Sequence, residues 1–303
     1  MATATDPVRR PLDGTAIGLM VVLCLCWGLQ QVAIKVAVHD VGPVMQAGVR
    51  SAIASVLVLV LAFALWRGTR LTLRDGTLPG GLAAGTLFGI EFLCIFIGLG
   101  HTTASRMAVF LYTAPIFTAL GLHAFVPGEH LRPRQWLGIG VAFAGMVLAF
   151  ADGMLHPAAG PSTSLGDALG VLAGVLWSAT TLVVRASRLS EAPAAKTLLY
   201  QLAVSAVLLL AMAAGTGQAW TANLTPTALA SLAYQSVLIA FASYLVWFWL
   251  LRRYLASRLS VFSFLTPMFG VAFGVLLLHD PVGLRFALAA ALVLSGILLV
   301  NLR

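Results

Sequence analysis

The sequence predicts an all-α polytopic membrane protein with ten transmembrane helices, arranged as two inverted five-helix repeats with both termini cytoplasmic. Of its 303 residues 60% are hydrophobic and 9% are charged, whereas an ordinary soluble domain is about 25% charged. The apolar residues fall into runs of roughly 20, the length at which a helix crosses about 30 Å of hydrocarbon. Positive charge lies mostly on one side of those runs, and the second half of the chain repeats a pattern of the first.

Charged residues, glycines and prolines divide the apolar part of the chain into ten segments. Each segment is apolar throughout instead of alternating, which favours helices over the strands of a membrane barrel. The first segment is too long for the core of a signal peptide and contains Lys35, so we expect it to be retained. The predicted spans are 14–38, 43–66, 77–100, 104–126, 135–151, 165–187, 194–214, 226–251, 257–279 and 283–302.

The distribution of Lys and Arg predicts the orientation. The net charge of +8 would suggest a nucleic-acid partner in a soluble chain, but here the cations lie between apolar runs. Fourteen of the 18 fall on the side of both termini, while the two longest loops, 152–164 and 215–225, fall on the other side and contain none. Because cytoplasmic loops are rich in Lys and Arg, we expect cytoplasmic termini, a lipid bilayer around the chain and no nucleic acid. The remaining four cations are Lys35, Arg50, Arg106 and Arg285.

An internal repeat relates the two halves of the chain. Residues 104–117 and 256–269 align without a gap and share seven of 14 residues. Because five spans is an odd number, the second half must enter the membrane from the opposite side, so the repeats are inverted. Inverted repeats are typical of secondary transporters that open a central site to each side in turn. An old duplication with no mechanistic role is the alternative. The predicted repeats are 14–151 and 165–302.

A group of residues in the first half forms a characteristic pattern. It consists of Trp27, Gly28, Lys35, Arg50, Tyr112, Pro115, Glu129, Gln135, Gly138 and Gly145. This pattern resembles the EamA domain of the drug/metabolite transporter superfamily, whose members carry two such domains in ten spans. The second half matches more loosely, with Asp280 in place of the family's Glu and Ala289 in place of its Gly. Within the family the chain is most similar to aromatic amino-acid exporters of the YddG type.

The resemblance implies a secondary transporter of the inner membrane that exports aromatic and other neutral amino acids by alternating access. We expect a small-molecule substrate, no cofactor and a monomer. A multidrug exporter of flat organic cations with the same fold is the alternative, and a membrane-embedded enzyme is a third. The enzyme is disfavoured because no long hydrophilic loop, G-x-x-x-x-G-K-[ST], H-E-x-x-H or G-x-S-x-G motif is present. The three cysteines and six histidines are scattered, which argues against a metal centre.

Glu91 is the first candidate functional residue, because it lies near the middle of span 77–100. A charge at the centre of a bilayer costs about 2.5–3.5 kcal/mol or more, so we expect its side chain to face the interior of the bundle. It is a candidate for proton coupling or for binding a substrate amine. Alternatively, it is a structural partner of Arg50 or Lys35, or a carboxyl group that stays protonated.

Polar and aromatic residues deep in the spans are the other candidates. Trp27, Gln31 and Lys35 share one helical stripe, and the repeat places Trp177, Thr181 and Arg185 on a matching stripe. Such stripes should face other helices or a cavity, with Lys35 and Arg185 snorkelling to the interfaces. Ordinary core packing is the alternative for any single residue. The candidate cavity residues are Trp27, Gln30, Gln31, Glu91, Tyr112, Trp177, Thr181, Tyr200, Gln201, Tyr234, Tyr244, Trp247 and Ser263.

Two prolines and several rows of glycines allow further predictions. Pro115 and Pro267 lie mid-span at equivalent points and predict paired hinges, or else fixed kinks. Glu129 and Asp280 follow equivalent spans, and we expect them to cap or pair at helix ends. Glycines spaced by four predict close helix packing. They are Gly81, Gly85, Gly89, Gly166, Gly170, Gly174, Gly270 and Gly274.

Overall fold

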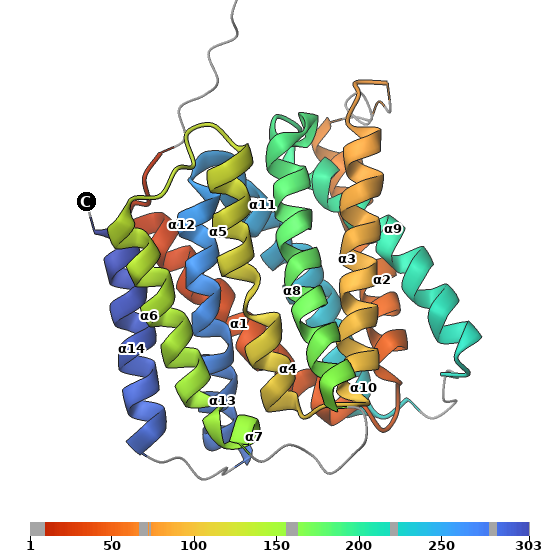
Figure 1. The fold of residues 1–303 in the computed structure, drawn as a ribbon. Coiled ribbons are helices and arrows are strands. Elements are labelled where there is room, and N and C mark those ends of the chain that lie inside the picture. Colours follow the sequence, from red (N-terminus) through yellow and green to blue (C-terminus); the bar gives the residue numbers. More distant parts are fainter. Residues whose placement is uncertain are drawn as a thin grey trace, which may run out of the picture.

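The computed structural model describes residues 10–66, 72, 74–155, 163–218, 224–278 and 284–302. Within these ranges the chain is helical apart from short connections, and an isolated bridge joins Arg10 to Tyr254 (Figure 1). The predicted all-α fold class is therefore confirmed.

The described part of the first half contains seven helices. They are α1 (Gly14–Ala37), α2 (Pro43–Trp66), α3 (Leu78–Leu99), α4 (Ala104–Leu111), α5 (Ala114–Phe125), α6 (Pro133–Ala149) and the short α7 (Ala151–Leu155). The second half follows the same order with more interruptions. Its helices are α8 (Thr163–Ala186), η1 (Arg188–Ser190), α9 (Ala194–Gly215), α10 (Pro226–Ala233), η2 (Tyr234–Ser243), α11 (Tyr244–Arg253), α12 (Ala256–Val261), η3 (Phe262–Phe264), α13 (Leu265–Leu278) and α14 (Leu284–Asn301).

These helices build the ten predicted spans. In the described part of the chain, nine helical segments of 18 residues or more are apolar enough to cross a membrane. The tenth span is α6, which has 17 residues. Three spans are not single regular helices, since the chain breaks between α4 and α5, turns π-helical in η2 and tightens to a 3₁₀ turn in η3. The broken spans carry five of the 13 polar and aromatic candidates: Tyr112, Tyr234, Tyr244, Trp247 and Ser263.

The two halves interleave instead of forming two separate bundles. α6 packs against α14, α1 against α13, α2 against α9, and α3 against both α8 and α9. Each of these pairs joins one helix from each repeat. The equivalent helices α4 and α12 also begin at opposite ends of the molecule, as inverted repeats require (Figure 1).

Glycines allow the closest of these contacts. A Cβ atom on Gly296 of α14 would lie 2.5 Å from the Gly138 carbonyl oxygen and 2.5 Å from the Ala142 nitrogen of α6. The predicted glycine rows of α3 and α8 likewise pack closely against α9 and α4, whereas a Cβ on Gly270 would have no neighbour nearer than 3.8 Å. Two of the three glycine rows therefore act as predicted, and Gly270 does not mark a tight contact.

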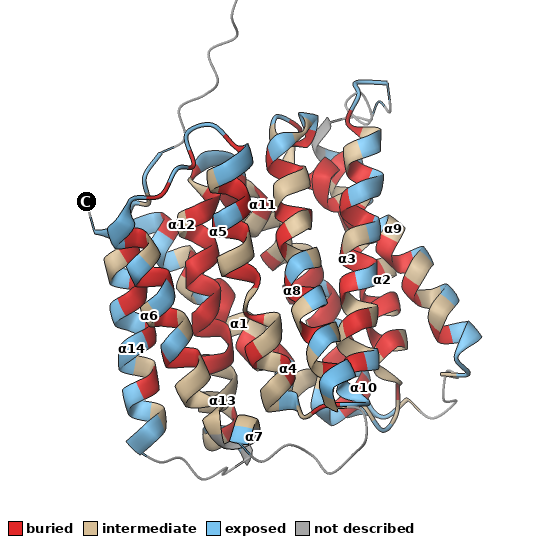
Figure 2. Ribbon diagram, in the orientation of Figure 1, coloured by how far each residue is buried: buried red, intermediate tan, exposed pale blue. Residues whose placement is uncertain are grey.

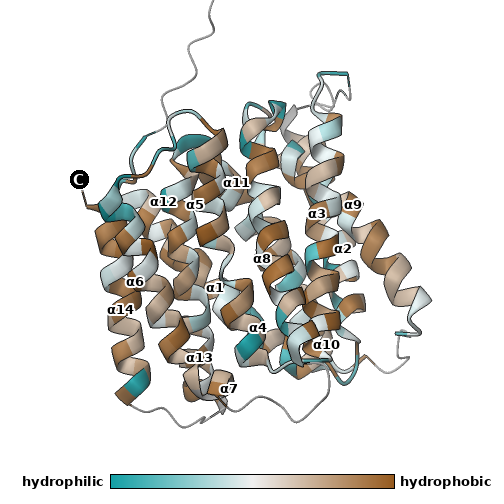
Figure 3. Cartoon of the chain, in the orientation of Figure 1, coloured by the Kyte–Doolittle hydropathy of each residue, from teal (hydrophilic) through white to brown (hydrophobic). Residues whose placement is uncertain are grey.

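The outer surface is apolar, and the described residues nearest to the two termini lie at the same face. Buried residues line the inner sides of the helices, and exposed apolar side chains such as Val207 and Leu276 cover the outside (Figures 2 and 3). The Arg10 amide donates to the Arg253 carbonyl over 3.0 Å, and residues near both ends line one pocket. We call this the terminal face, and its opposite the distal face.

Candidate functional site

Aromatic side chains from three helices meet inside the bundle. The Trp27 ring of α1 makes edge-to-face contacts with Tyr244 and Trp247 of α11, at centroid distances of 6.4 and 5.9 Å. Its indole N–H donates to the Ser243 hydroxyl over 2.9 Å. Tyr244 in turn lies 5.9 Å from the Phe88 ring of α3. We call Trp27, Phe88, Phe92, Tyr244 and Trp247 the aromatic cluster.

Two ionisable residues of opposite sign border the aromatic cluster. Arg50 of α2 is 1% exposed, and its guanidinium lies 4.5 Å above the Phe92 ring. Glu91 of α3 is 6% exposed, and Arg50 acts on it electrostatically. Among the described residues, however, neither belongs to an ion pair within 4.0 Å. The Nε and Nη2 atoms of Arg50 and the Oε2 atom of Glu91 are buried and have no hydrogen-bond partner.

Burying these side-chain atoms without hydrogen-bond partners costs free energy unless a bound molecule supplies the partners. A buried polar atom without a hydrogen bond costs about 1–3 kcal/mol, and more when the group is charged. Arg50 and Glu91 together offer a donor and an acceptor at one place in the bundle, beside flat apolar rings. Such a site suits a ligand that carries both charges.

A second aromatic pair adjoins the first group. Tyr112 is 7% exposed and follows the last residue of α4, where the span breaks. Its ring lies 5.6 Å from that of Trp177 in α8, in an edge-to-face contact. Tyr112 is also within electrostatic range of Tyr244 and Glu91, so the second pair lies in the same part of the bundle as Glu91. The structure thus brings together six predicted candidates: Trp27, Glu91, Tyr112, Trp177, Tyr244 and Trp247.

Other candidates lie apart from this group. The Tyr200 hydroxyl lies 3.2 Å from that of Thr77, the residue just before α3. Gln31 is exposed, and Tyr234 donates to the Cys26 carbonyl over 3.0 Å. The remaining candidates are buried: Thr181 and Ser263 donate to carbonyls of their own spans, and among the described residues neither Gln30 nor Gln201 hydrogen-bonds to the aromatic cluster.

Sequence reasoning did not place Arg50, Phe88 and Phe92 in the site. The signal for Arg50 is present, since it is a lone cation within an apolar span and part of the residue pattern of the first half, but the sequence suggested for its side chain only a structural pairing with Glu91. The phenylalanines carry no comparable signal, because phenylalanine is frequent in any apolar span. Gln46 was also missed, and it accepts a hydrogen bond of 2.8 Å from Gln235.

A buried ion pair joins the two halves near the terminal face. Arg185 of α8 pairs with Glu129, and both side chains are 1% exposed. The Glu129 carboxylate also accepts from the Ala256 and Ser257 amides, over 2.9 and 3.1 Å, and so caps α12. The expectation that Glu129 pairs or caps at a helix end is confirmed. The expectation that Arg185 snorkels is wrong, because a carboxylate from the other half reaches it inside the protein. Its repeat equivalent Lys35 is exposed.

The predicted hinge positions coincide with breaks in the helices. Pro115 is the second residue of α5, just after Tyr112 and Thr113 interrupt the span. Pro267 follows the 3₁₀ turn η3. Bending at these points during function stays a prediction. Asp280, the repeat equivalent of Glu129, lies outside the described residues.

The ten apolar spans, the interleaved inverted halves and the polar group buried between them define a polytopic membrane transporter. The model of the EamA-like transporter family matches residues 14–151 and 164–302. The chain belongs to the EamA-like transporter family and carries two EamA domains, and it is a multi-pass membrane protein and not an enzyme.

Relatives of known name agree with this assignment. The chain is 28% identical over 296 residues to a probable amino-acid metabolite efflux pump of Escherichia coli K12, covering 94% of this chain and 93% of that protein. It is 27% identical to an uncharacterized transporter of Archaeoglobus fulgidus, covering 93% and 95% of the two chains. The uncharacterized inner membrane transporter YedA of E. coli K12 is 23% identical, with 94% and 90% covered. A protein of known crystal structure superposes with a TM-score of 0.77 at 22% identity, covering 95% of this chain and 98% of that one, and so shares the fold.

Proposed function

We propose that the protein exports amino acids, aromatic and other neutral types, from the cytoplasm by alternating access. The observation that carries this proposal is the pair of buried, unpartnered charges beside the aromatic cluster. A zwitterionic amino acid presents a carboxylate and an ammonium group a few bonds apart. Arg50 supplies the donors for the carboxylate, and Glu91 supplies the acceptor for the ammonium.

The aromatic cluster accounts for the side-chain preference. Aromatic rings stack edge-to-face with centroids about 4.5–7 Å apart, and Trp27, Phe88 and Tyr244 already meet within that range. A flat side chain entering between them exchanges one set of such contacts for another. Smaller neutral side chains lose this contribution but keep both charge contacts. The proposed selectivity is therefore broad for amino acids and strongest for aromatic ones.

The two halves supply the movement. In our proposal the repeats 14–151 and 165–302 rock against each other around the central group, with both termini in the cytoplasm and the protein acting as a monomer. Pro115 and Pro267 absorb the bending at equivalent points of the two halves. The E. coli relative named as an amino-acid metabolite efflux pump supports the substrate class and the outward direction.

A multidrug exporter of flat cations is the second candidate. It would use the same aromatic cluster, with Glu91 as the counter-charge. Arg50 disfavours it, because a buried guanidinium within electrostatic range of Glu91 repels a cation bound there.

Flux into proteoliposomes distinguishes the two candidates. The panel is labelled tryptophan, phenylalanine, threonine, methionine, tryptamine and one flat organic cation, each with and without an imposed pH gradient. We expect flux of the four amino acids with mutual competition, and little flux of tryptamine, which lacks the carboxylate. An effect of the gradient would indicate proton coupling. Flux of the organic cation and tryptamine alone would support the multidrug exporter.

Variants test the two charges. Arg50→Gln and Glu91→Gln should each lower amino-acid flux by about 10- to 100-fold, since hydrogen bonds to charged groups contribute about 1.5–3 kcal/mol. Glu191→Gln, at an exposed position on the terminal face, is the matched control and should transport normally. Normal flux in folded Arg50→Gln and Glu91→Gln proteins would remove this pair from the mechanism.

A further inference from the structure

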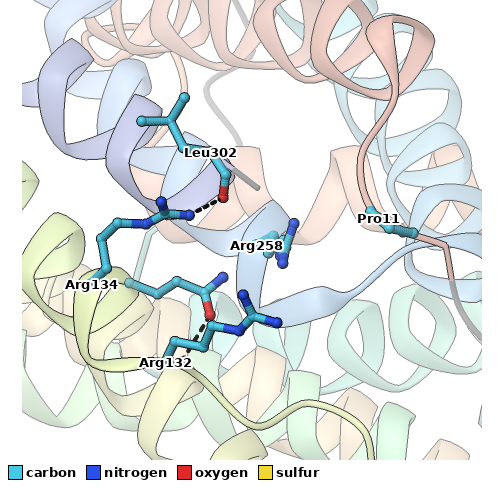
Figure 4. Close-up of a pocket in the computed structure, with 6 residues that line it drawn as sticks. Pro11, Arg132, Arg134, Arg258 and Leu302 are labelled. Carbon is cyan, nitrogen blue, oxygen red and sulfur yellow. Dashed lines mark hydrogen bonds between the residues drawn. The ribbon is translucent and has the colours of Figure 1, made fainter.

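A second polar site lies at the terminal face, away from the aromatic cluster. A cavity of about 180 Å³ opens there, where α6 begins and where α12 and the end of α14 approach the N-terminal segment (Figure 4). Its lining residues are Pro11, Arg132, Arg134, Gln135, Arg258 and Leu302. Three of these six are arginines and none is acidic.

The positive charge in this cavity is concentrated. Arg132 and Arg134 act on Arg258 by like-charge repulsion. Arg134 donates to the Leu302 carbonyl, which is a neutral acceptor (Figure 4). No carboxylate within hydrogen-bonding distance of Arg132 or Arg258 occurs in the described part of the chain.

Among the described residues, the groups next to Arg132 and Arg258 do not neutralise the charge of these two arginines. Glu129 attracts Arg258 electrostatically, but its two oxygens already accept from Arg185, Ala256 and Ser257. Gln135 closes the wall of the cavity, accepting from the Arg132 amide over 2.9 Å and donating to the Val300 carbonyl over 3.0 Å. This part of the wall is thus polar and ordered, and none of the described residues that line the cavity is acidic.

We propose that this cavity binds a phosphate group, carried by an anionic phospholipid or by a soluble phosphate compound. Guanidinium groups present planar sets of donors that match the oxygens of phosphate, and they keep their charge at any physiological pH. Basic pockets between the ends of transmembrane helices are typical sites for anionic headgroups. The cavity also far exceeds the space that one water molecule needs.

The surface beside the cavity suits the acyl chains of a lipid. Leu137 lies three residues after Arg134 on α6 and is 61% exposed. Leu298 of α14 lies four residues before Leu302 and is 63% exposed. A phospholipid whose headgroup occupies the cavity can lay its tails on this apolar surface. A soluble phosphate compound would use the arginines alone.

The test is binding of defined lipids and phosphates to the purified full chain in neutral detergent. Phosphatidylglycerol and phosphatidylcholine are compared by native mass spectrometry and by the shift in apparent Tm, with inorganic phosphate and glycerol 3-phosphate as competitors. Arg132→Gln and Arg258→Gln are compared with Arg252→Gln. Arg252→Gln is the control, because it removes an equal charge from the same face. Arg252 is exposed and donates to the Glu191 carbonyl.

We expect phosphatidylglycerol to bind in preference to phosphatidylcholine. Each pocket variant should weaken that binding about five-fold, and the double variant about 25-fold, while Arg252→Gln changes it less than two-fold. Competition by inorganic phosphate or glycerol 3-phosphate at similar concentrations would identify the soluble source of the phosphate. Failure of both competitors, with phosphatidylglycerol binding intact, would identify the lipid.

Equal binding of the two lipids without competition by phosphate, or phosphatidylglycerol binding that survives in the double variant, would overturn the proposal. Because Arg132 is exposed, Arg132→Gln alone keeps the test valid if Arg258→Gln does not fold. Transport is not the readout, so the result is independent of the proposed amino-acid site.

Discussion

Replacing Glu129 by glutamine should destabilise the protein by about 3–5 kcal/mol, the cost of leaving one member of a buried ion pair alone. The carboxylate accepts hydrogen bonds from the Arg185 guanidinium, from the Ala256 amide, and from both the amide and the hydroxyl of Ser257. A glutamine side chain has only one acceptor oxygen, so its NH2 group would face at least one of these donors. Arg185 would keep its bond of 2.9 Å to the Leu251 carbonyl but would lose its charged partner.

The partner variant and the double variant give the coupling between the two charges. Arg185→Gln should cost less than Glu129→Gln, because Glu129 keeps its three bonds to the start of α12. The double variant removes both charges, so its loss should be smaller than the sum of the two single losses by about 0.5–3 kcal/mol.

Thermal unfolding followed by tryptophan fluorescence in detergent measures these differences. Glu129→Gln should lower the apparent Tm by about 6 °C or more, whereas the exposed control Glu191→Gln should leave it nearly unchanged. An equal Tm for these two variants, or single losses that simply add in the double variant, would refute the reasoning.

Three further predictions concern packing, pH and the aromatic cluster. Gly296→Ala should cost about 1–3 kcal/mol, while Gly140→Ala, which meets nothing within 4 Å, should be neutral or stabilising in the same thermal assay. Hydrogen bonding by Lys196 lowers the pKa of Asp75 below its ordinary value, so the pair stabilises above about pH 3.9 and weakens on acidification. Asp75→Asn should therefore lower Tm at pH 7, with a difference from the native protein that shrinks towards pH 3. Trp27→Phe removes one donor and should reduce tryptophan flux several-fold in a folded protein; unchanged flux would exclude that donor.

Most of the fold follows from features that are local in the sequence. Apolar runs separated by charges place the spans within a few residues, because a span must bury its backbone polar groups in a helix. The breaks at Pro115 and Pro267 were indicated by proline itself. The π-helix Tyr234–Ser243 contains neither proline nor glycine, so nothing in the local sequence marks it. Such a distortion arises from packing against neighbouring helices.

The site was harder to predict than the spans because it depends on which helices meet. Tyr200 and Trp247 are equally deep aromatic residues in the sequence, yet one packs near Thr77 and the other contacts Trp27. Helical periodicity assigns a residue to a face of its own helix, and only the interleaving of the two repeats decides what that face meets. The place of Arg50 in the site could not be predicted from the sequence for the same reason.

Lys35 and Arg185 have different surroundings in the two halves of the protein. The two residues occupy equivalent positions of the two halves, and inversion places them towards opposite faces. Arg185 is buried and bound to Glu129 at the terminal face, whereas Lys35 is exposed. Glu129 and Arg185 thus tie the two halves together at the terminal face, whereas Asp280, the repeat equivalent of Glu129, lies outside the described residues. If the halves exchange conformations, as the proposed mechanism requires, the cost of releasing the Glu129–Arg185 pair contributes to the barrier for opening that face.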